Sequence, residues 1–328
     1  MNFYVIGSNS FSGSHFIDYL LGKNHSVIGV SRSEEINPVF LAYKTNSSKS
    51  KFTFLKRNLN TDSELMLGDL SRFDIDYVVN FAAQGMVAQS WEKPEDWYET
   101  NFVGNVKFHD KLRQYSKLKK YVHVSTPEVY GSTASSIVEN YNYNPSTPYA
   151  VSRAACDLSL MAFHKNYNFP VVFTRAANVY GPGQQLYRII PKAALCILLG
   201  KKIPLHGGGV SLRSFIHMQD VCSATYHIAT KAVPPDVFHI STEEEITIRS
   251  LVETICEKLN KKFNDCVDLH EERPGKDFAY RLNSNKLRKS FDWSPKVSLD
   301  VGLDETLRWV CDNIEELRKI PDYYIHKT

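Results

Sequence analysis

Near the start of the chain stands Phe3-Tyr4-Val5-Ile6-Gly7-Ser8-Asn9-Ser10-Phe11-Ser12-Gly13, a short apolar run followed by a turn of small residues. The run has the length and composition of a buried strand, and residues 14–21 carry a helical pattern. A strand, such a turn and a helix form the context in which a dinucleotide pyrophosphate lies against a helix N-terminus. We therefore predict a dinucleotide-binding loop that includes Gly7, Ser10, Phe11 and Gly13.

The following segments alternate between apolar runs and helical patterns. The spacing predicts strands at residues 3–6, 27–30, 52–56, 77–81, 120–125 and 171–175, and helices at 14–21, 96–115 and 149–167. This alternation is typical of an α/β fold with a doubly wound, parallel, Rossmann-type sheet. Turns rich in glycine and proline mark a more irregular region beyond residue 175. We predict a dinucleotide-binding domain at 1–176, with a returning strand near 237–240, and a smaller C-terminal α/β substrate lobe at 177–328.

The second predicted strand is followed by Ser31-Arg32-Ser33. An acidic residue at this point binds the adenosine ribose hydroxyls of NAD and repels the 2′-phosphate of NADP. None stands in this triplet, and a guanidinium pairs well with a phosphate. Arg32 therefore favours NADP over NAD, the alternative being that it is a solvated loop cation.

Composition excludes several classes of protein. The 328 residues are 43% hydrophobic and carry a net charge of +3, without the dense basic run of a dedicated nucleic-acid binder. The six cysteines form no C-x-x-C pair and the 11 histidines do not cluster, so we expect no metal and a reduced, cytoplasmic setting. The apolar stretch at 193–199 is too short to span a bilayer, and we expect no signal peptide before the first strand.

Two short motifs carry groups suited to moving protons at a sugar carbon. The first, Thr126-Pro127-Glu128, supplies a hydroxyl and a carboxylate, and the second pairs Tyr149 with Arg153. Residues four apart lie on the same face of a helix, so Arg153 is expected to lower the pKa of the Tyr149 phenol. With a nicotinamide cofactor nearby, this is the set of groups expected of an oxidising site with an additional carboxylate.

These motifs belong to a resemblance that runs nearly end to end. The sequence resembles the extended short-chain dehydrogenases of the NAD-dependent epimerase/dehydratase family, and is most similar to the nucleotide-sugar 4,6-dehydratases of the GDP-mannose, CDP-glucose and dTDP-glucose type. The stretches that carry it are Asn80-Phe81-Ala82-Ala83-Gln84, Thr100-Asn101-Phe102-Val103-Gly104, residues 125–131, residues 178–183, Arg213 with Asp220, and residues 273–277 followed by Trp293-Ser294-Pro295-Lys296.

The resemblance implies a reaction and a set of roles. A 4,6-dehydratase removes hydride from sugar C4, eliminates water across C5–C6 and returns the hydride to C6, so its NAD or NADP stays bound and is recycled. Tyr149 would take the C4 hydroxyl proton with Thr126 holding the oxygen, Glu128 would be the base at C5, and Arg153 would support Tyr149. The other implied cofactor contacts are Asn58, Leu59, Ala82, Ala83, Gln84, Asn101 and Ser125. The implied contacts to a nucleotide-diphospho-sugar are Gln84, Thr126, Asn178, Lys192, Arg213 and Arg273.

Two departures from the family pattern keep alternatives open. Arg153 stands where the family has lysine, and Pro127 stands where the dTDP-glucose enzymes have a proton-donating aspartic acid. Ser10 also replaces a glycine of the cofactor loop. One alternative is a nucleotide-sugar 4-epimerase or UDP-uronate decarboxylase on the same scaffold. The other is a catalytically impaired protein that binds nucleotide sugar and NAD(P).

Aromatic residues surround the two long predicted helices, 96–115 and 149–167. They are Tyr98, Phe102, Phe108, Tyr115, Phe163 and Tyr167. In the resembled family these helices pair with their copies, which implies a homodimer, while the same residues would also suit a subunit core. Neither the nucleotide base nor the sugar can be identified from the sequence.

Overall fold

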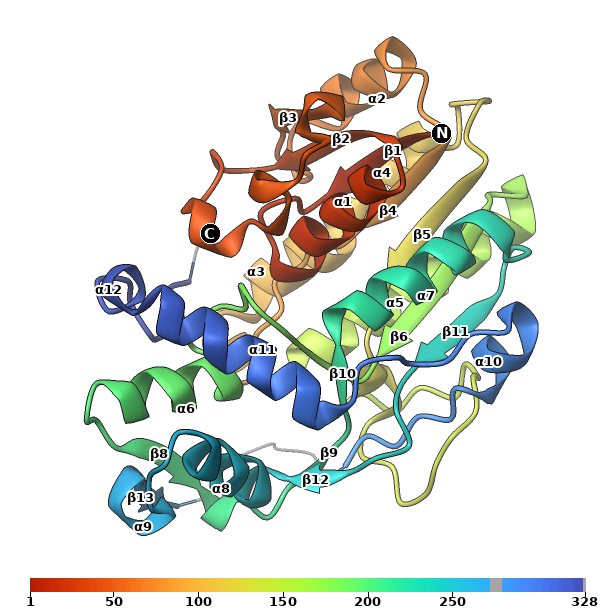
Figure 1. The fold of residues 1–328 in the computed structure, drawn as a ribbon. Coiled ribbons are helices and arrows are strands. Elements are labelled where there is room, and N and C mark those ends of the chain that lie inside the picture. The colour runs from red at the N-terminus through yellow and green to blue at the C-terminus, as the bar shows by residue number, and fades with distance from the viewer. Residues whose placement is uncertain (272–278, 327–328) are drawn as a thin grey trace.

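The computed structural model describes residues 1–271 and 279–326. Its central element is a seven-stranded sheet in the order β11-β6-β5-β4-β1-β2-β3, in which every neighbouring pair is parallel (Figure 1). The strands are β1 (Asn2–Ile6), β2 (Ser26–Ser31), β3 (Phe52–Lys56), β4 (Tyr77–Asn80), β5 (Lys120–Val124), β6 (Val171–Ala176) and β11 (Val237–Ile240). The predicted α/β, Rossmann-type fold is confirmed.

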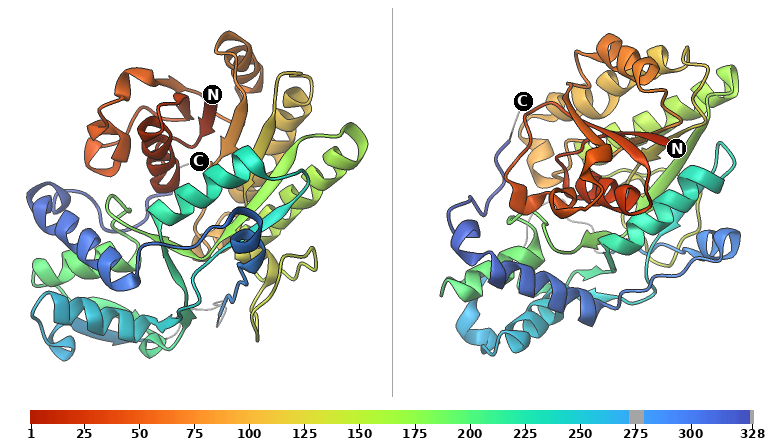
Figure 2. Two further views of the ribbon diagram at one scale, coloured as in Figure 1. Left: turned by 45° about the vertical axis from the view of Figure 1, so that its right-hand side comes forward. Right: turned by 45° about the horizontal axis from the view of Figure 1, so that its top comes forward.

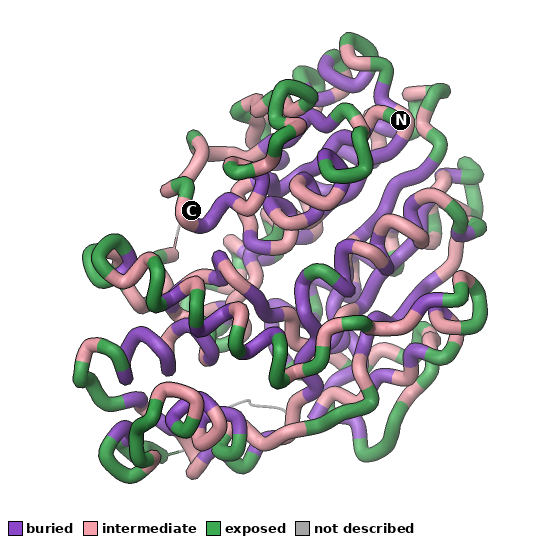
Figure 3. Tube along the Cα trace, viewed as in Figure 1, coloured by how far each residue is buried: buried purple, intermediate pink, exposed green. Residues whose placement is uncertain are grey.

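Helices cover both faces of this sheet (Figure 2). One face packs against α1 (Phe11–Gly22) and α7 (Met218–Lys231), and the other against α2 (Ser63–Arg72), α4 (Gly104–Leu112) and α5 (Pro148–Tyr167). The strands are buried almost throughout except for the edge strand β3, whereas the outer helix surfaces are exposed (Figure 3). A parallel sheet shielded on both faces explains why its strands are continuous apolar runs and were easy to predict.

The remaining elements form a second packed region. It contains three short strand pairs: β7 (Asn178–Tyr180) with β10 (Phe215–His217), β8 (Ile203–His206) with β13 (Val267–His270), and β9 (Leu212–Arg213) with β12 (Ile246–Thr247). Its helices are α6 (Ile189–Leu198), α8 (Ile248–Lys258), α9 (Phe263–Cys266), α11 (Leu299–Asp312) and α12 (Ile314–Leu317). An apolar cluster from α6, α8 and α11 forms its core. Helix α10 (Asn285–Phe291) returns to pack on β11.

Two helical predictions differ from the structure. The helix α2 was not predicted, because its sequence SELMLGDLSR has a glycine in the middle and few apolar positions. The segment predicted as one helix at 96–115 consists of α3 (Pro94–Tyr98), a π-helical turn (Glu99–Val103) and α4. The Asn105 side-chain amide donates to the carbonyls of Thr100 and Asn101, which supplies partners to backbone groups in the wider turn.

Short 3-10 turns complete the chain. They are Pro38–Phe40, Ala42–Thr45, Lys49–Lys51, Ala88–Trp91, Pro127–Tyr130 and Gly207–Gly209. The turn Pro127–Tyr130 follows β5 at the carboxyl edge of the sheet, the edge at which open α/β sheets bind their ligands.

Candidate active site

A cavity of about 510 Å³ lies at the carboxyl edge of β1, β2 and β4. Of the predicted cofactor contacts, Gly7, Ser10, Arg32, Asn58, Leu59, Ala82, Ala83 and Gln84 line it. Its size falls within the range typical of ligand sites. The lining runs from the loop before α1 to the segment after β2, the path that a dinucleotide follows in this fold.

The loop before α1 is shaped by two glycines and one serine. Gly7 has φ +88°, and a Cβ there would lie 2.7 Å from the backbone nitrogen of Ala82. A Cβ on Gly13 would lie 2.2 Å from the carbonyl oxygen of Gly7, so the helix can approach the strand only with glycine at this position. Ser10 has an extended φ of −76° and needs no glycine; its hydroxyl donates to Gly7 O and accepts from Gly13 N, which caps α1. The loop therefore fits a dinucleotide despite the missing middle glycine.

Other predicted cofactor residues lie behind the cavity wall. Asn101 is buried and exchanges two hydrogen bonds with the backbone of Gln84, and its amide also donates to the Ser152 hydroxyl. The Ser125 hydroxyl is directed into the interior, where it donates to Asp157 at 2.7 Å. Phe11 is buried beside His15 in α1. These three residues shape the wall, and the cavity surface is formed by their neighbours.

The structure brings Thr126, Glu128 and Tyr149 together. Thr126 begins the turn after β5 and its side chain accepts a hydrogen bond from the Glu128 backbone nitrogen at 3.4 Å. Tyr149 is the second residue of α5, whose start is fixed by Thr147 and Pro148, and its hydroxyl is hydrogen-bonded to Thr126. Tyr149 is only 9% exposed. A phenol, a hydroxyl and a carboxylate thus share one desolvated site.

Burial raises the pKa of Tyr149, and the charge of Glu128 raises it further. Arg153, the Thr126 hydrogen bond and Arg188 each act in the opposite direction without outweighing these two causes. The prediction that Arg153 lowers this pKa is therefore confirmed in direction, but burial and Glu128 outweigh it in the protein without ligand. An additional positive charge, such as an oxidised nicotinamide ring, is needed to favour the phenolate at neutral pH.

Arg153 lies below Tyr149 and points into the interior. It is 2% exposed, donates from Nη2 to the carbonyl of Val124, and lies with Nη2 3.3 Å from His123 Nε2. Among the described residues, its Nε and Nη1 have no hydrogen-bond partner. The charge is therefore held one turn from the phenol by the backbone of β5.

We predict that Arg153→Met raises the pKa of Tyr149 further, because a positive charge that favours the phenolate is lost. The ultraviolet difference titration of the variant, referenced to Tyr149→Phe in the same background, measures this shift. Turnover at neutral pH should fall by about tenfold or more, and the acid limb of the pH–rate profile should move to higher pH. Arg153→Lys keeps the charge and should restore most of the difference; an unchanged titration in Arg153→Met would show that Arg153 has no influence on the phenol.

The predicted substrate contacts are distributed unevenly. Asn178 lies in β7, and its backbone nitrogen donates to Ser214 O. Arg213 donates to Leu212 O and stacks over the Tyr280 ring at 5.1 Å. The Lys192 ammonium lies 3.4 Å from the carbonyl oxygen of Asp322, on the C-terminal segment. Arg273 lies outside the described residues.

Two motif residues serve the scaffold. The Asp220 carboxylate accepts from the backbone nitrogens of Lys296 and Val297 and is 2% exposed. The Trp293 indole donates to the Ser223 hydroxyl at 2.8 Å. Both motifs therefore hold the chain after α10 against α7.

Several residues of the site were not predicted. Arg188 precedes α6 and is close enough to Tyr149 to influence its pKa, and Tyr187 lines the cavity beside it. An arginine and a tyrosine between a Gly-Pro-Gly turn and an apolar helix were a usable signal for an anion site. Residues 320, 321 and 323–325 also line the cavity, and no local pattern in the sequence indicates this.

The described parts of the chain contain neither a candidate metal-ligand cluster nor a candidate membrane-spanning helix. Residues 1–271 and 279–326 contain no group of three or more histidine, cysteine, aspartate or glutamate side chains that could hold a metal ion. Within the same ranges, each helix falls short of the length and apolar character that crossing a membrane requires.

Comparison with known proteins matches this arrangement. The model of the GDP-mannose 4,6-dehydratase family matches residues 4–306. A dTDP-glucose 4,6-dehydratase of Haemophilus influenzae is 28% identical over 95% of this chain and 98% of its own. The crystal structure of a dTDP-glucose 4,6-dehydratase from Streptomyces venezuelae with NAD bound superposes with a TM-score of 0.89 at 29% identity, covering 96% of this chain and 98% of its own. The crystal structure of the UDP-glucose 4-epimerase of Thermotoga maritima superposes with a TM-score of 0.85 at 26% identity, covering 96% of this chain and 100% of its own. The chain belongs to the GDP-mannose 4,6-dehydratase family, within the epimerase/dehydratase branch of the short-chain dehydrogenases.

Proposed function

We propose that the protein is a nucleotide-sugar 4,6-dehydratase that converts a nucleotide-diphospho-hexose into its 4-keto-6-deoxy derivative. The observation that carries this proposal is the shared buried site of Thr126, Glu128 and Tyr149 at the ligand-binding edge of the sheet. Proton transfer at C4 requires the phenol and the hydroxyl, and elimination across C5–C6 requires the additional carboxylate. The 4,6-dehydratase relatives over nearly the full chain support it.

The residues at the cavity fit a nicotinamide dinucleotide. Gly7 and Ser10 would hold the pyrophosphate at the start of α1, Asn58 and Leu59 would border the adenine, and Ala82 to Gln84 would face the nicotinamide half. The chemistry that such a cofactor supplies when bound is acceptance of a hydride from C4 and its return at C6. The reaction is therefore redox-neutral, and its only other product is water.

Tyr149 acts first in this scheme. As phenolate it takes the proton of the C4 hydroxyl while the C4–H electron pair leaves as hydride, so that a carbonyl forms at C4. The Thr126 hydroxyl, hydrogen-bonded to the phenol, holds the C4 oxygen within reach. Arg153 and Arg188 favour the phenolate from two sides.

Glu128 acts second. The new C4 carbonyl acidifies the C5 proton, which the Glu128 carboxylate removes as the C6–O bond breaks. Pro127 has no proton to give, so the leaving hydroxyl takes its proton from Glu128 or from water. Hydride then returns to C6, C5 is reprotonated, and neither cofactor nor protein is consumed.

An epimerase is the second candidate function, because a UDP-glucose 4-epimerase shares the fold at a TM-score of 0.85. Solvent exchange separates the two reactions. A dehydratase run in deuterium oxide places one deuterium at C5 of the product, detected by NMR. A 4-epimerase returns its hydride to C4 and leaves C5 without deuterium, so a product with no label at C5 would contradict the proposal.

Arg32 bears on the choice of cofactor. It follows β2 and lines the cavity, where an adenosine 2′-phosphate would lie, which supports NADP over NAD. Arg32→Ala should weaken NADPH binding by about tenfold or more and leave NADH nearly unchanged, because a charge-assisted contact to phosphate is removed. Fluorescence titration with both dinucleotides measures this, and equal losses for the two would remove the support for NADP.

The exposed apolar side chains of α3 and α5 support a homodimer. Tyr98, Val151 and Leu158 are 37%, 40% and 52% exposed. Phe108 is instead buried in the subunit core, and the Tyr115 hydroxyl is hydrogen-bonded to the carbonyls of Leu70 and Ile75.

The domain boundary near residue 176 and a cytoplasmic location stay predictions.

A further inference from the structure

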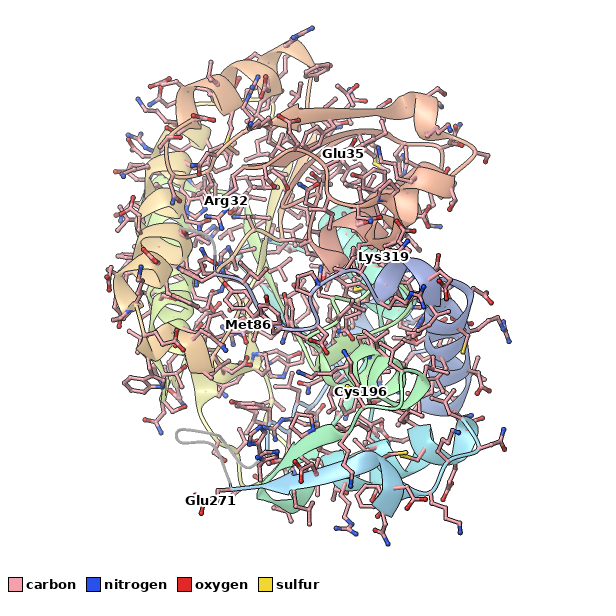
Figure 4. The ribbon with its side chains drawn as sticks, turned by 90° about the vertical axis from the view of Figure 1, so that its left-hand side faces the viewer. Arg32, Glu35, Met86, Cys196, Glu271 and Lys319 are labelled. Carbon is pink, nitrogen blue, oxygen red and sulfur yellow. The ribbon has the colours of Figure 1, made fainter. Side chains whose placement is uncertain are left out.

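The segment after α12 forms part of the lining of the cofactor cavity. Ile320, Pro321, Tyr323, Tyr324 and Ile325 line the cavity together with Gly7, Arg32 and Gln84, which belong to the opposite end of the chain. Figure 4 shows this segment running from Lys319 between Arg32 on one side and Met86 on the other. It therefore lies alongside the loops at the carboxyl edge of the sheet that form the rest of the cavity lining.

The middle of the segment is attached to the cavity wall through Tyr324. Its hydroxyl donates to Gln84 Oε1 at 3.3 Å, and its ring packs edge-on against Tyr187 at 5.6 Å. Gln84 is itself fixed by Asn101, which also bonds Ser152 in α5. Burial raises the pKa of the Tyr324 phenol, and Arg32 and Arg188 act on it in the opposite direction.

The far end of the segment is anchored on α3. His326 stacks on Trp97 with ring centroids 5.0 Å apart and planes at 6°, and its Nε2 donates to Asp96 Oδ2 at 2.6 Å. The near end is held by Lys192, which donates to the carbonyl of Asp322. The segment is therefore held at both ends, by Lys192 and by Asp96.

We propose that residues 320–326 form a strap that closes over the bound nicotinamide dinucleotide, with Tyr324 as a cofactor-contacting residue and His326 as the anchor that must detach before the cofactor leaves. The strap suits the redox-neutral reaction proposed above, on which this inference rests in part. An enzyme that restores its cofactor in every turnover gains nothing from exchanging it, and the strap suppresses that exchange.

Cofactor release tests the strap without any sugar substrate. The purified full chain is loaded with NADH or NADPH, and the loss of fluorescence is followed after mixing with excess oxidised dinucleotide. His326→Ala removes the anchor, Tyr324→Phe removes only the bond to Gln84, and a chain ending at Lys319 removes the whole strap. Tyr167→Phe is the matched control, because this tyrosine lies at the end of α5 and is 55% exposed.

We expect release to accelerate by about 3- to 10-fold in Tyr324→Phe, the effect of one lost hydrogen bond, and by more than about tenfold in His326→Ala and the shortened chain. Tyr167→Phe should release at the wild-type rate. Unchanged release in both His326→Ala and Tyr324→Phe would overturn the strap, as would tighter binding by the shortened chain, since the segment would then occupy the cofactor's place.

The outcome is separable from that of the proposed function. Faster release in the strap variants, together with no product from any nucleotide sugar, would support the strap and contradict the dehydratase. Release at the wild-type rate in these variants, together with product formation at the wild-type rate, would contradict the strap and support the dehydratase. Circular dichroism and thermal unfolding confirm that the shortened chain folds, and His326→Ala, a single change at the surface, provides an independent test.

Discussion

Tyr149→Phe should lower kcat by about 10³-fold or more while the variant still binds its dinucleotide. The change removes one oxygen, the atom that takes the C4 proton in the proposed reaction, and leaves the buried ring in place at the start of α5. Without that base, hydride cannot leave C4, so the near-ultraviolet band of reduced nicotinamide should not develop when substrate is added. Steady-state product formation and single-turnover absorbance measure the two effects.

Tyr167→Phe is the matched control for this variant. It makes the same chemical change in the same helix, but at a side chain that is 55% exposed and distant from Thr126. It should leave kcat unchanged. A Tyr149→Phe enzyme with near wild-type turnover would remove the phenol from the mechanism and make Glu128 the base for both proton transfers.

Glu128→Gln should separate the two halves of the reaction. Oxidation at C4 depends on Tyr149 and should continue, whereas elimination should slow by about 10²- to 10⁴-fold because the base at C5 is lost. Reduced nicotinamide should therefore accumulate on the enzyme when substrate is added. The loss of the carboxylate charge also removes a cause of the raised pKa of Tyr149, so the acid limb of the oxidation step should move to lower pH.

Glu257→Gln, at an exposed glutamate of α8, is the control for this change. Its turnover and its pH profile should equal those of the wild type. If Glu128→Gln instead formed product at the normal rate, the carboxylate would be idle, which is the behaviour expected of an epimerase. Loss of both oxidation and elimination would show that Glu128 supports Tyr149 and is not a separate base.

The inner strands of the sheet were predictable because they are shielded on both faces and are therefore short apolar runs, as in Phe3–Ile6 and Tyr77–Asn80. The grouping of Thr126 with Tyr149 was also predictable, since one follows β5 and the other opens the next helix. The inward direction of Arg153 was not, because it depends on the carbonyl of Val124 and on His123, which belong to the neighbouring strand.

Residues joined across long stretches of chain were the least predictable. Tyr324 contacts Gln84 across 240 positions, and no periodicity in either segment indicates the pairing. Lys192, whose role in binding substrate stays a prediction, contacts the carbonyl of Asp322 across 130 positions, and neither segment indicates this pairing. The helix α2 was missed because its stability depends on packing against α4 and the sheet more than on its own propensities.

Mass spectrometry of the protein incubated with GDP-, CDP-, UDP- and dTDP-hexoses carrying deuterium at C4 tests the assignment most directly. The proposed mechanism predicts that one of these sugars loses the mass of one water and keeps its deuterium, which moves from C4 to C6. That result would also name the nucleotide. A loss of carbon dioxide, or a changed NMR spectrum at constant mass, would contradict dehydration and assign a decarboxylase or an epimerase.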